Sequence, residues 1–386
     1  MGESLAHELL TIERAGLKRV MRTVERGQGV ELLLDGRRVV DFSSNDYLGL
    51  AGDPRVGRAA AEMLESSSTG AGAARLISGT HPIHVELERE IAAFKGAAAA
   101  LLFASGYAAN TGAIPALAGR RDVIYADQLN HASLIDGARL SRAEIRVFPH
   151  LDLASLRSML LSDSGKFRRR MIVVDGVFSM DGDIFPLADL VPLAREFDAW
   201  TYVDDAHATG VLGASGRGSA EYCGVDGEID VVMGTLGKAL GTVGAFICGS
   251  DVLVEYLMNR ARAFVFTTAS PPAFAAATLE ALRIAQSEPW RRERLVTNAC
   301  HLRARLSKIG LTSGGEADGF IVPILLGGAD RTAAVGRALC DAGYLVGAVR
   351  PPTVPMGQSR LRITVSAGHD TRHIDGLVAA IGAVLA

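Results

Sequence analysis

Two stretches of this chain decide the fold that we expect: Tyr202-Val203-Asp204-Asp205-Ala206-His207 and Val231-Val232-Met233-Gly234-Thr235-Leu236-Gly237-Lys238. Each runs from apolar residues into polar ones, which is typical of a buried strand whose carboxyl end lies at the edge of a parallel sheet. Open α/β sheets hold their chemistry at that edge. We therefore expect Asp204, His207 and Lys238 to meet there.

Similar apolar runs alternate with helical stretches through the middle of the chain, from about residue 54 to 285. The runs cover residues 100–103, 123–125, 171–174, 201–203, 229–233 and 245–248. Because they are too apolar for a half-exposed sheet, they predict a mostly parallel sheet that helices cover on both faces. The predicted fold class is therefore α/β.

The N-terminal part reads differently. Apolar residues recur at near-helical spacing from about residue 4 to 23, which predicts an amphipathic helix that lies on another surface. A hairpin signal follows around Asp35-Gly36. Together these segments predict an N-terminal arm that can serve as a dimer element.

After a long helical tract at about residues 287–309, the regular alternation of apolar runs and helices ends. Strands expected over residues 319–325, 344–347 and 360–365, with two helices, predict a small α+β domain. The expected division is an arm over residues 1–50, a large α/β domain over 51–286 and the small domain over 287–386.

The composition excludes several classes of function. Lys and Arg number 40 against 43 Asp and Glu, so a nucleic-acid partner is not indicated, and small molecules or copies of the chain are the expected partners. No apolar run approaches the roughly 18 residues of a membrane span, and the N-terminus lacks a secretion signal. The four cysteines, Cys223, Cys248, Cys300 and Cys340, lack metal-ligand spacing, so we expect buried thiols, no metal site and a cytoplasmic location.

The segment Ser105-Gly106-Tyr107-Ala108-Ala109-Asn110 joins an apolar run to the start of a helix. Such a turn directs backbone N–H groups and the positive end of a helix dipole at an anion. It lacks the glycine pattern of dinucleotide sites and the lysine of the P-loop, so a single phosphate monoester fits it better than a nucleotide. Standing alone, the segment is equally an ordinary turn between a strand and a helix.

The pair Asp204 and Lys238 indicates a Schiff-base cofactor. A carboxylate after an apolar strand is unfavourable unless a cation pairs with it, and a protonated pyridine nitrogen is such a cation. A lysine desolvated in a pocket becomes both a nucleophile and a base near neutral pH. Taken singly, each is an ordinary loop aspartate or solvated lysine, and Asp205 is expected to be structural. Taken together, they predict pyridoxal 5'-phosphate (PLP), which needs a lysine for its aldehyde and an acid for its ring nitrogen.

Three further residues follow expected strands and can complete such a site. His131 begins a helix, and its planar imidazole can stack over an aromatic cofactor. Ser179 and His207 can share a hydrogen bond to a phenolic oxygen, and Ser179 alternatively to a substrate carboxylate. As single residues they are equally a structural histidine, a turn serine and a surface histidine.

Read as a set, these segments resemble the α-oxoamine synthase family of fold-type-I PLP enzymes. The resemblance extends over nearly the whole chain and is carried by residues 41–50, 105–110, 130–133, 176–183, 203–210, 235–238, 350–355 and 360–362. It implies a PLP-dependent transferase with a large, mostly parallel sheet domain and a small C-terminal α+β domain.

The resemblance also implies a role for each matching residue. Lys238 would carry the cofactor as an imine, Asp204 would pair with the pyridine nitrogen, and His131 would stack on the ring. The remaining cofactor contacts would be His207 and Ser179 to the ring oxygen, and Gly106, Tyr107, Thr235 and, from a neighbouring subunit, Thr267 or Thr268 to the phosphate. The implied substrate contacts are Arg362 and Asn45 to the amino-acid carboxylate, and Arg19 and Thr353 to the acyl donor.

The implied reaction is a decarboxylative condensation of an amino acid with an acyl thioester, in a homodimer with its active site at the interface. The motif of residues 350–353 favours L-alanine and a pimeloyl thioester, as in biotin biosynthesis. The alternatives are glycine or serine with another acyl thioester, a fold-type-I aminotransferase, or a silent binding protein. Ala208 stands where relatives often have glycine, and Asp175 replaces a more usual glutamate, but neither change removes a required group.

Overall fold

The computed structural model describes residues 2–26, 29–317 and 319–386. Residues 1, 27 and 28 of the predicted arm, and residue 318, lie outside the described residues. The chain forms two compact units. The large unit comprises residues 53–179 and 184–292, and the small unit comprises residues 1–52, 180–183 and 293–386. The predicted three-part division stays a prediction.

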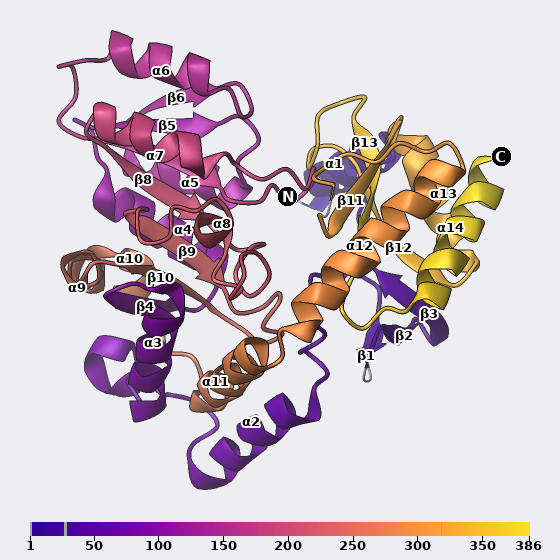
Figure 1. The fold of residues 1–386 in the computed structure, drawn as a ribbon, viewed down its shortest axis with the longest axis horizontal. Helices are drawn as coiled ribbons and strands as arrows, with labels where there is room; N and C mark the ends of the chain where they lie inside the picture. The colour runs from indigo at the N-terminus through magenta and orange to yellow at the C-terminus, as the bar shows by residue number, and fades with distance from the viewer. Residues whose placement is uncertain (1, 27–28, 318) are drawn as a thin grey trace. The chain divides into compact units, whose positions relative to one another are not determined.

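The large unit contains a seven-stranded sheet in the order β4-β10-β9-β8-β7-β5-β6 (Figure 1). Its strands are β4 (Ala99–Phe103), β5 (Val123–Asp127), β6 (Glu144–Phe148), β7 (Arg170–Asp175), β8 (Ala199–Asp204), β9 (Val231–Thr235) and β10 (Ala245–Gly249). Strands β5 to β9 pair in parallel, and β10 runs antiparallel to both β4 and β9. The predicted mostly parallel sheet is confirmed.

Two apolar cores, one on each face of this sheet, bury most of its strand residues. Met171 and Val173 of β7 belong to one core, and Ile172 and Val174 to the other, because successive strand residues point to opposite faces. The helices of this unit are α2 (Pro54–Ser66), α3 (Pro82–Lys95), α4 (Gly106–Leu117), α5 (Ala132–Ser141), α6 (Leu153–Ser162), α7 (Leu187–Glu196), α8 (Ser219–Tyr222), α9 (Asp251–Arg260), α10 (Arg262–Val265) and α11 (Pro272–Ser287), with a π-helical turn η1 (Arg75–Gly79). Burial on both faces leaves the strand ends as the place for polar side chains.

The small unit contains a six-stranded sheet in the order β1-β2-β3-β12-β13-β11. Its strands are β1 (Val24–Arg26), β2 (Glu31–Leu34), β3 (Arg37–Phe42), β11 (Ile321–Gly327), β12 (Tyr344–Val349) and β13 (Ser359–Thr364), and its helices are α1 (Gly2–Arg14), α13 (Ala329–Asp341) and α14 (Thr371–Leu385). Helix α12 (Trp290–Lys308) begins in the large unit and continues into the small one. The hairpin predicted around Asp35-Gly36 is present, and its strand β3 pairs in parallel with β12. The N-terminal strands thus share a sheet with the C-terminal ones.

Two local expectations are wrong. The N-terminal helix ends at Arg14 instead of continuing to residue 23, because Gly16 follows in the left-handed region, with φ of 66°. Cys300 is exposed instead of buried, because it lies on the side of α12 away from the buried Ala299 and Leu302. Of the four cysteines, Cys248 is the buried one.

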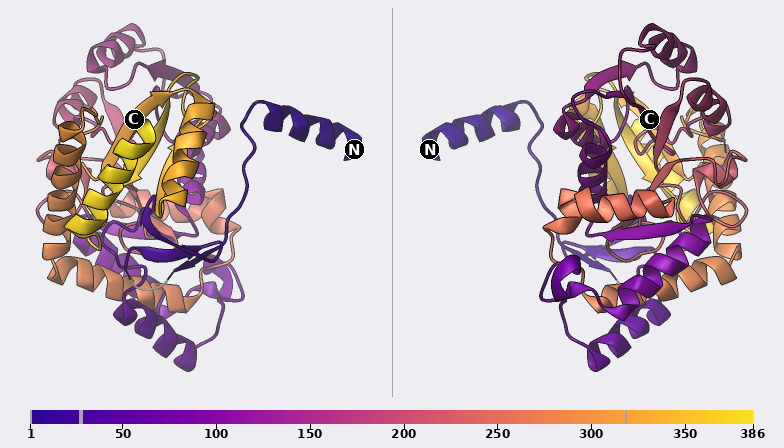
Figure 2. Two further views of the ribbon diagram at one scale, coloured as in Figure 1. Left: turned by 90° about the vertical axis from the view of Figure 1, so that its right-hand side faces the viewer. Right: turned by 90° about the vertical axis from the view of Figure 1, so that its left-hand side faces the viewer.

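Helix α1 stands away from the rest of its unit (Figure 2). Its apolar residues Leu5, Leu9, Leu10 and Ile12 are exposed. None of the helices in the described part of the chain combines the length and hydrophobicity that a membrane span requires.

Candidate functional site

The carboxyl ends of β7, β8 and β9 bring the predicted cofactor residues together. The parallel register pairs Asp175 with Asp204 and Asp204 with Met233, so these strands end at the same level. Asp175 and Asp204 are each 3% exposed. Two buried carboxyl groups on neighbouring strands disfavour each other's ionisation.

Asp204 is held by neutral donors. Its Oδ2 accepts from Asn110 Nδ2 at 2.7 Å, and its Oδ1 accepts from the backbone N–H of Ala206 at 3.0 Å. Burial raises the pKa of Asp204, while Lys238, the Asn110 hydrogen bond and His131 act in the opposite direction. Among the described residues, no ion pair includes Asp204. Its carboxylate therefore retains the capacity to pair with a cationic ligand.

Lys238 follows β9 and reaches the residue that was predicted beside it. Its Nζ lies 3.0 Å from His207 Nε2, and His207 is buried. An ammonium group only donates, so Nε2 of His207 is the acceptor when Lys238 is charged. An adjacent acceptor of this kind can receive the proton that a lysine loses when it acts as a nucleophile.

His131 caps the N-terminus of α5, as its position after β5 predicts. Its backbone N–H donates to Asp175 Oδ2 at 2.7 Å, and its Nδ1 lies 2.7 Å from Ser133 Oγ. Although His131 is exposed, the protein atoms around its ring exclude enough water to lower its pKa. Asp204 opposes that lowering and Lys238 adds to it, which shows that the three side chains share one electrostatic environment.

The buried carboxyl group of Asp175 takes a different state from Asp204. Burial and the neighbouring Asp204 raise the pKa of Asp175 well above its usual value. Its one hydrogen bond here comes from the His131 N–H, whereas Asp204 receives two and lies near Lys238. We therefore assign the proton of this pair to Asp175 and the negative charge to Asp204.

The predicted anion site begins α4. The Ser105 side chain caps this helix by accepting from the Ala108 N–H at 3.1 Å, and the first N–H groups of any helix, here those of Gly106 and Tyr107, have no intrahelical acceptor. A Cβ added to Gly106 would lie 3.6 Å from Met233 Cε, so α4 starts beside β9. The Thr235 hydroxyl at the end of β9 donates to Gly244 O at 3.2 Å. An anion contact by Thr235 would compete with that bond and stays a prediction.

Three further predicted cofactor residues, Ser179, Thr267 and Thr268, come from two other segments of the large unit. Ser179 lies in the loop after β7 and is partly buried. Thr267 and Thr268 line a small cavity together with Phe103 and Ala104, and Thr268 forms a bridge with Ala74. Their roles stay predictions.

The predicted substrate residues lie in the small unit and form two pairs. Arg19 donates to Thr353 Oγ1 at 3.1 Å, and Arg362 donates to Asn45 Oδ1 at 3.1 Å. Arg362 is 7% exposed, and the same Asn45 oxygen accepts from the buried Tyr47 hydroxyl at 3.0 Å. The structure thus brings together the two residues predicted for each substrate group.

The sequence missed a buried polar chain behind the site. Asn110, Ser133 and Tyr202 are each at most 1% exposed, and Asn110 bonds to both of the others. A polar residue among the small apolar residues of α4, one turn after Gly106, was the available signal.

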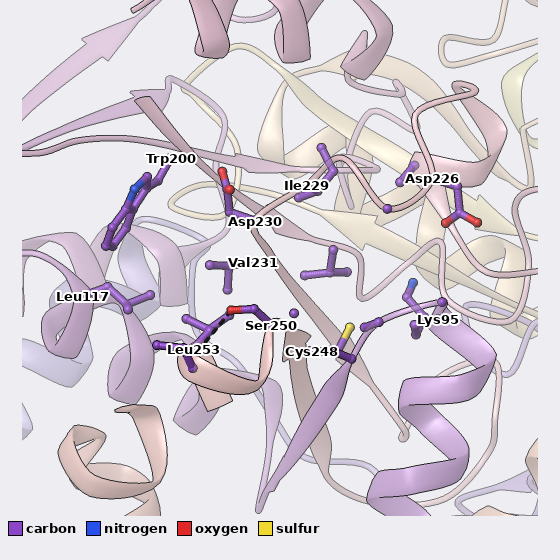
Figure 3. A pocket seen from close by; sticks show the side chains of 18 of the residues that line it. Lys95, Leu117, Trp200, Asp226, Ile229, Asp230, Val231, Cys248, Ser250 and Leu253 are labelled. Atoms are coloured by element: carbon purple, nitrogen blue, oxygen red, sulfur yellow. Dashed lines mark hydrogen bonds between the residues drawn. The ribbon is translucent and has the colours of Figure 1, made fainter. Parts of the chain in front are cut away.

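A cavity of about 650 Å³ lies elsewhere, at the amino ends of β8 and β9 (Figure 3). Trp200, Asp230 and Val231 line it, and none of the predicted site residues does. Its size makes it a candidate pocket, but the reactive side chains lie at the opposite ends of the strands. The described residues also contain no group of three or more His, Cys, Asp or Glu side chains placed to hold a metal ion.

A family model described as aminotransferase class I and II matches residues 37–381. The chain belongs to this family. Two 8-amino-7-oxononanoate synthases from Alkalilimnicola ehrlichii and Geotalea daltonii are 50% and 49% identical to it. The alignments cover 95% and 99% of this chain and 93% and 98% of those proteins. The predicted membership of the α-oxoamine synthases is confirmed.

Solved structures of family members agree with the fold. A variant of serine palmitoyltransferase from S. paucimobilis, solved with bound PLP, superimposes with a TM-score of 0.93 at 32% identity, covering 99% of this chain and 96% of that one. The 8-amino-7-oxononanoate synthase of Francisella tularensis gives a TM-score of 0.78 at 28% identity, covering 90% and 98%. The predicted fold-type-I class is therefore confirmed.

The residues of this aminotransferase-family chain fit PLP by their chemistry. They offer a primary amine beside an imidazole at 3.0 Å, a buried carboxylate that accepts hydrogen bonds from neutral donors, an exposed imidazole and the start of a helix. An aldehyde, a pyridine nitrogen, an aromatic ring and a phosphate are the groups that these features match.

Proposed function

We propose that this chain is a PLP-dependent acyltransferase that condenses L-alanine with a pimeloyl thioester to 8-amino-7-oxononanoate, in biotin biosynthesis. A carbon–carbon bond forms between the alanine Cα and the acyl carbon, the thiol leaves, and the alanine carboxylate departs as CO2. The observation that carries the proposal is the near 50% identity to 8-amino-7-oxononanoate synthases over almost the whole length of both chains.

PLP would be held at the carboxyl ends of β7 to β9. Lys238 would carry its aldehyde carbon, Asp204 would face its ring nitrogen, and His131 would cover one ring face. The phosphate would lie at the start of α4, with Gly106, Tyr107 and Thr235 as donors, while Ser179 and His207 would hold the ring oxygen. When bound, PLP supplies an electron-withdrawing ring that stabilises negative charge on the substrate Cα.

The chain's own side chains supply the proton transfers. The free amine of Lys238 would take the proton from the alanine Cα. His207, at 3.0 Å from Lys238 Nζ, accepts a hydrogen bond that orients this amine. The buried carboxylate of Asp204 keeps a proton on the nitrogen that faces it, because an ion pair is strong where water is excluded.

The small unit would bind the substrates. The guanidinium of Arg362, oriented by Asn45, matches a carboxylate in two hydrogen bonds. Arg19 and Thr353, which lie 3.1 Å apart, would contact the acyl donor.

A homodimer completes the proposal, with Thr267 or Thr268 of one subunit reaching the phosphate of the other. The exposed apolar residues Leu76 and Ile77 of η1 and Phe266 support it, because Thr268 and Ala74 join these segments in one bridge. Exposed apolar surface of this kind marks interaction sites. The exposed apolar side of α1 supports a docking role in the same dimer. We place the enzyme in the cytoplasm, as its free cysteines indicate.

The test is a product assay with purified enzyme. L-Alanine, glycine and L-serine are each combined with pimeloyl, acetyl, succinyl and palmitoyl thioesters, and CO2 and free thiol are measured. We expect the highest kcat/KM with L-alanine and the pimeloyl thioester. Preference for serine with the palmitoyl thioester would favour the activity named for the S. paucimobilis structure instead. Keto-acid release without CO2 or thiol would indicate an aminotransferase, and a colourless protein without turnover would indicate a silent member of the family.

A further inference from the structure

A series of hydrogen-bonded side chains lies behind the candidate site, and the proposed function gives no role to its buried members Tyr202, Asn110 and Ser133. It starts at Tyr202, passes through Asn110 and Ser133, and ends at His131, with a branch from Asn110 to Asp204. Every bond in it is between 2.7 and 2.8 Å. Because buried polar groups are costly unless they are fully paired, this chain is a constraint and not a coincidence of packing.

The orientation of the Asn110 amide follows from its partners. An ionised carboxylate only accepts hydrogen bonds, so the amide group facing Asp204 Oδ2 at 2.7 Å must be NH2. The Asn110 Oδ1 then faces the Tyr202 hydroxyl at 2.7 Å, which must donate to it. The second hydrogen of the NH2 group goes to Ser133 Oγ at 2.8 Å. All the hydrogen-bonding groups of this side chain are therefore directed.

The direction continues to His131. Ser133 Oγ accepts from Asn110, so its own proton is available for His131 Nδ1 at 2.7 Å. The backbone N–H of Ser133 also points at Nδ1, at 3.2 Å. With two donors directed at it, Nδ1 is an acceptor, and the ring is neutral with its proton on Nε2.

We infer that Asn110 is the positioning residue that sets both partners of the cofactor ring, holding Asp204 as an oriented carboxylate and, through Ser133, His131 as the neutral Nε2–H tautomer. The inference rests on the proposed function, because it assigns Asp204 and His131 to the two sides of PLP. A neutral imidazole on the ring face does not repel the pyridinium that Asp204 stabilises. Asn110 lies four residues after Gly106 on α4, so the same helix would present the phosphate donors and this amide.

The test compares two isosteric substitutions. Asn110→Asp turns the NH2 group into an oxygen, sets two carboxyl groups against each other and redirects the Ser133 hydroxyl away from His131. The matched control is Asn298→Asp in α12 of the small unit, where another buried amide donates to the carbonyls of Ser366 and His369. Apoprotein of each full-length variant is titrated with PLP, followed by its visible absorption.

We expect Asn110→Asp to weaken PLP binding by about 10- to 100-fold, as for a lost hydrogen bond to a charged group. Asn298→Asp should leave the affinity within about twofold of wild type, since it alters none of the side chains hydrogen-bonded to Asn110. Ser133→Ala breaks only the branch to His131, so its loss of affinity should be under about tenfold, the effect of one neutral hydrogen bond.

A second readout reports on His131 itself. Nitrogen NMR of histidine-labelled apoprotein, assigned with His131→Gln, should show Nδ1 unprotonated and Nε2 protonated in the wild type at pH 7. In Asn110→Asp the added negative charge and the redirected hydroxyl should shift His131 toward its protonated form. Wild-type affinity for PLP together with unchanged His131 nitrogen shifts in Asn110→Asp would overturn the inference.

Two further results separate the explanations. If the wild type binds no PLP, the proposed function fails, and the NMR result alone decides the assignment of the His131 tautomer. If Asn110→Asp does not fold, Ser133→Ala and Tyr202→Phe replace it. Tyr202→Phe removes the donor that fixes the amide and should weaken PLP binding by about 2- to 10-fold. Wild-type affinity and nitrogen shifts in both would then overturn the inference.

Discussion

The two ends of β8 and β9 carry charged side chains in opposite states. At the carboxyl ends, Asp204 accepts from an amide and a backbone N–H and forms no ion pair among the described residues. At the amino ends, the charged groups that line the cavity of Figure 3 have internal partners. Asp226 pairs with Arg217. Asp230 accepts from the N–H and the hydroxyl of Thr201, and it is exposed, so water balances its charge, whereas Asp204 is buried. The amino ends therefore hold a large cavity, whereas the carboxyl ends hold a buried carboxylate that forms no ion pair among the described residues.

The adjacent residues Asp204 and Asp205 repeat this contrast within one dipeptide. Asp205 pairs with the buried Lys95 at 2.7 Å and accepts from both the N–H and the hydroxyl of Ser219. Its charge is balanced inside the fold. Asp204 receives hydrogen bonds only from neutral donors among the described residues and a longer-range attraction from Lys238, so a cationic ligand can balance its charge further.

The largest effect is expected for Lys238→Ala. The proposed amine and base are lost together, so product formation should fall by at least about 10³-fold. Lys166→Ala serves as the control, because Lys166 is an exposed partner of Asp163, and its activity should stay within about twofold. Release of CO2 from L-alanine and the pimeloyl thioester is the measurement. More than a tenth of the wild-type rate in Lys238→Ala would remove this lysine from the chemistry.

Changing each of the two aspartates to asparagine should affect stability and activity differently. Asp205→Asn leaves the Lys95 ammonium buried without its counterion, so the apoprotein should lose about 3–5 kcal/mol of unfolding free energy. Asp204→Asn removes a buried charge whose hydrogen bonds come only from neutral donors among the described residues, so stability should stay equal or rise while product formation falls by about 10²-fold or more. Urea unfolding of both apoproteins measures the first effect. Equal destabilisation by both changes would mean that the contrast between the two carboxylates does not exist.

The sequence predicted the residues of the site better than their connections. Asp204 and Lys238 were found because each follows an apolar run, and the position at a strand end is a local property. The bond from Asn110 to Asp204 joins residues 94 positions apart, and the one from Lys95 to Asp205 joins residues 110 positions apart. No local sequence pattern predicts which of two adjacent aspartates forms an ion pair with a lysine far away in the sequence, because the tertiary fold determines that pairing.

The fold shows the same division. The alternating apolar runs predicted the parallel sheet, because burial on both faces requires them. That β3 pairs with β12 could not be predicted, since strands more than 300 residues apart meet there through Tyr344 and Val40, with no turn between them to fix the register. The end of α1 at Arg14 could be predicted from Gly16, because a glycine favours the left-handed conformation that ends a helix, although the apolar spacing continues beyond it.

In the small unit, Arg360 and Arg362 lie two residues apart on β13 and are both buried. Arg360 pairs with Asp181, whereas Arg362 donates to the neutral amide oxygen of Asn45. Arg362→Lys cannot form the two-pronged contact with a carboxylate and should raise KM for L-alanine by about 10- to 100-fold, with a smaller change in kcat. Arg360→Lys is the matched control and should leave KM within about threefold, because its partner belongs to the protein. Steady-state kinetics with varied alanine decide, and an equal rise in both would assign Arg362 a structural role.

A smaller effect should appear in the pH dependence of stability. Burial and Asp204 raise the pKa of Asp175, so the folded state binds this proton more tightly than the unfolded chain. The stabilisation is complete below the unfolded pKa near 3.8 and is lost as pH rises toward the folded value. Asp175→Asn keeps an acceptor for the His131 N–H but cannot ionise. Relative to wild type, its unfolding free energy should therefore improve between pH 4 and pH 8.

Asp152→Asn gives the opposite sign and serves as the control for this measurement. Asp152 caps α6, and its hydrogen bonds from Ser155 lower the pKa of Asp152. Its stabilisation is present above the unfolded pKa and is lost as pH falls, so this variant should lose stability relative to wild type at pH 8 and not at low pH. Urea unfolding at several pH values compares the two apoproteins. The same slope for both variants would refute the assignment of the proton to Asp175.

The smallest effect is expected at the cavity of Figure 3. Val252 lies at its rim and is 76% exposed, so Val252→Trp can place an indole in the cavity without disturbing the core. Because Asp226 and Lys95 are paired inside the protein and Asp230 is exposed to water, the region offers a substrate no buried charge in need of a partner, and kcat/KM should stay within about twofold of wild type. A tenfold loss in a variant that retains its unfolding free energy would show that the amino ends of β8 and β9 communicate with the carboxyl ends. The cavity would then contribute to activity although its charged residues are paired or exposed.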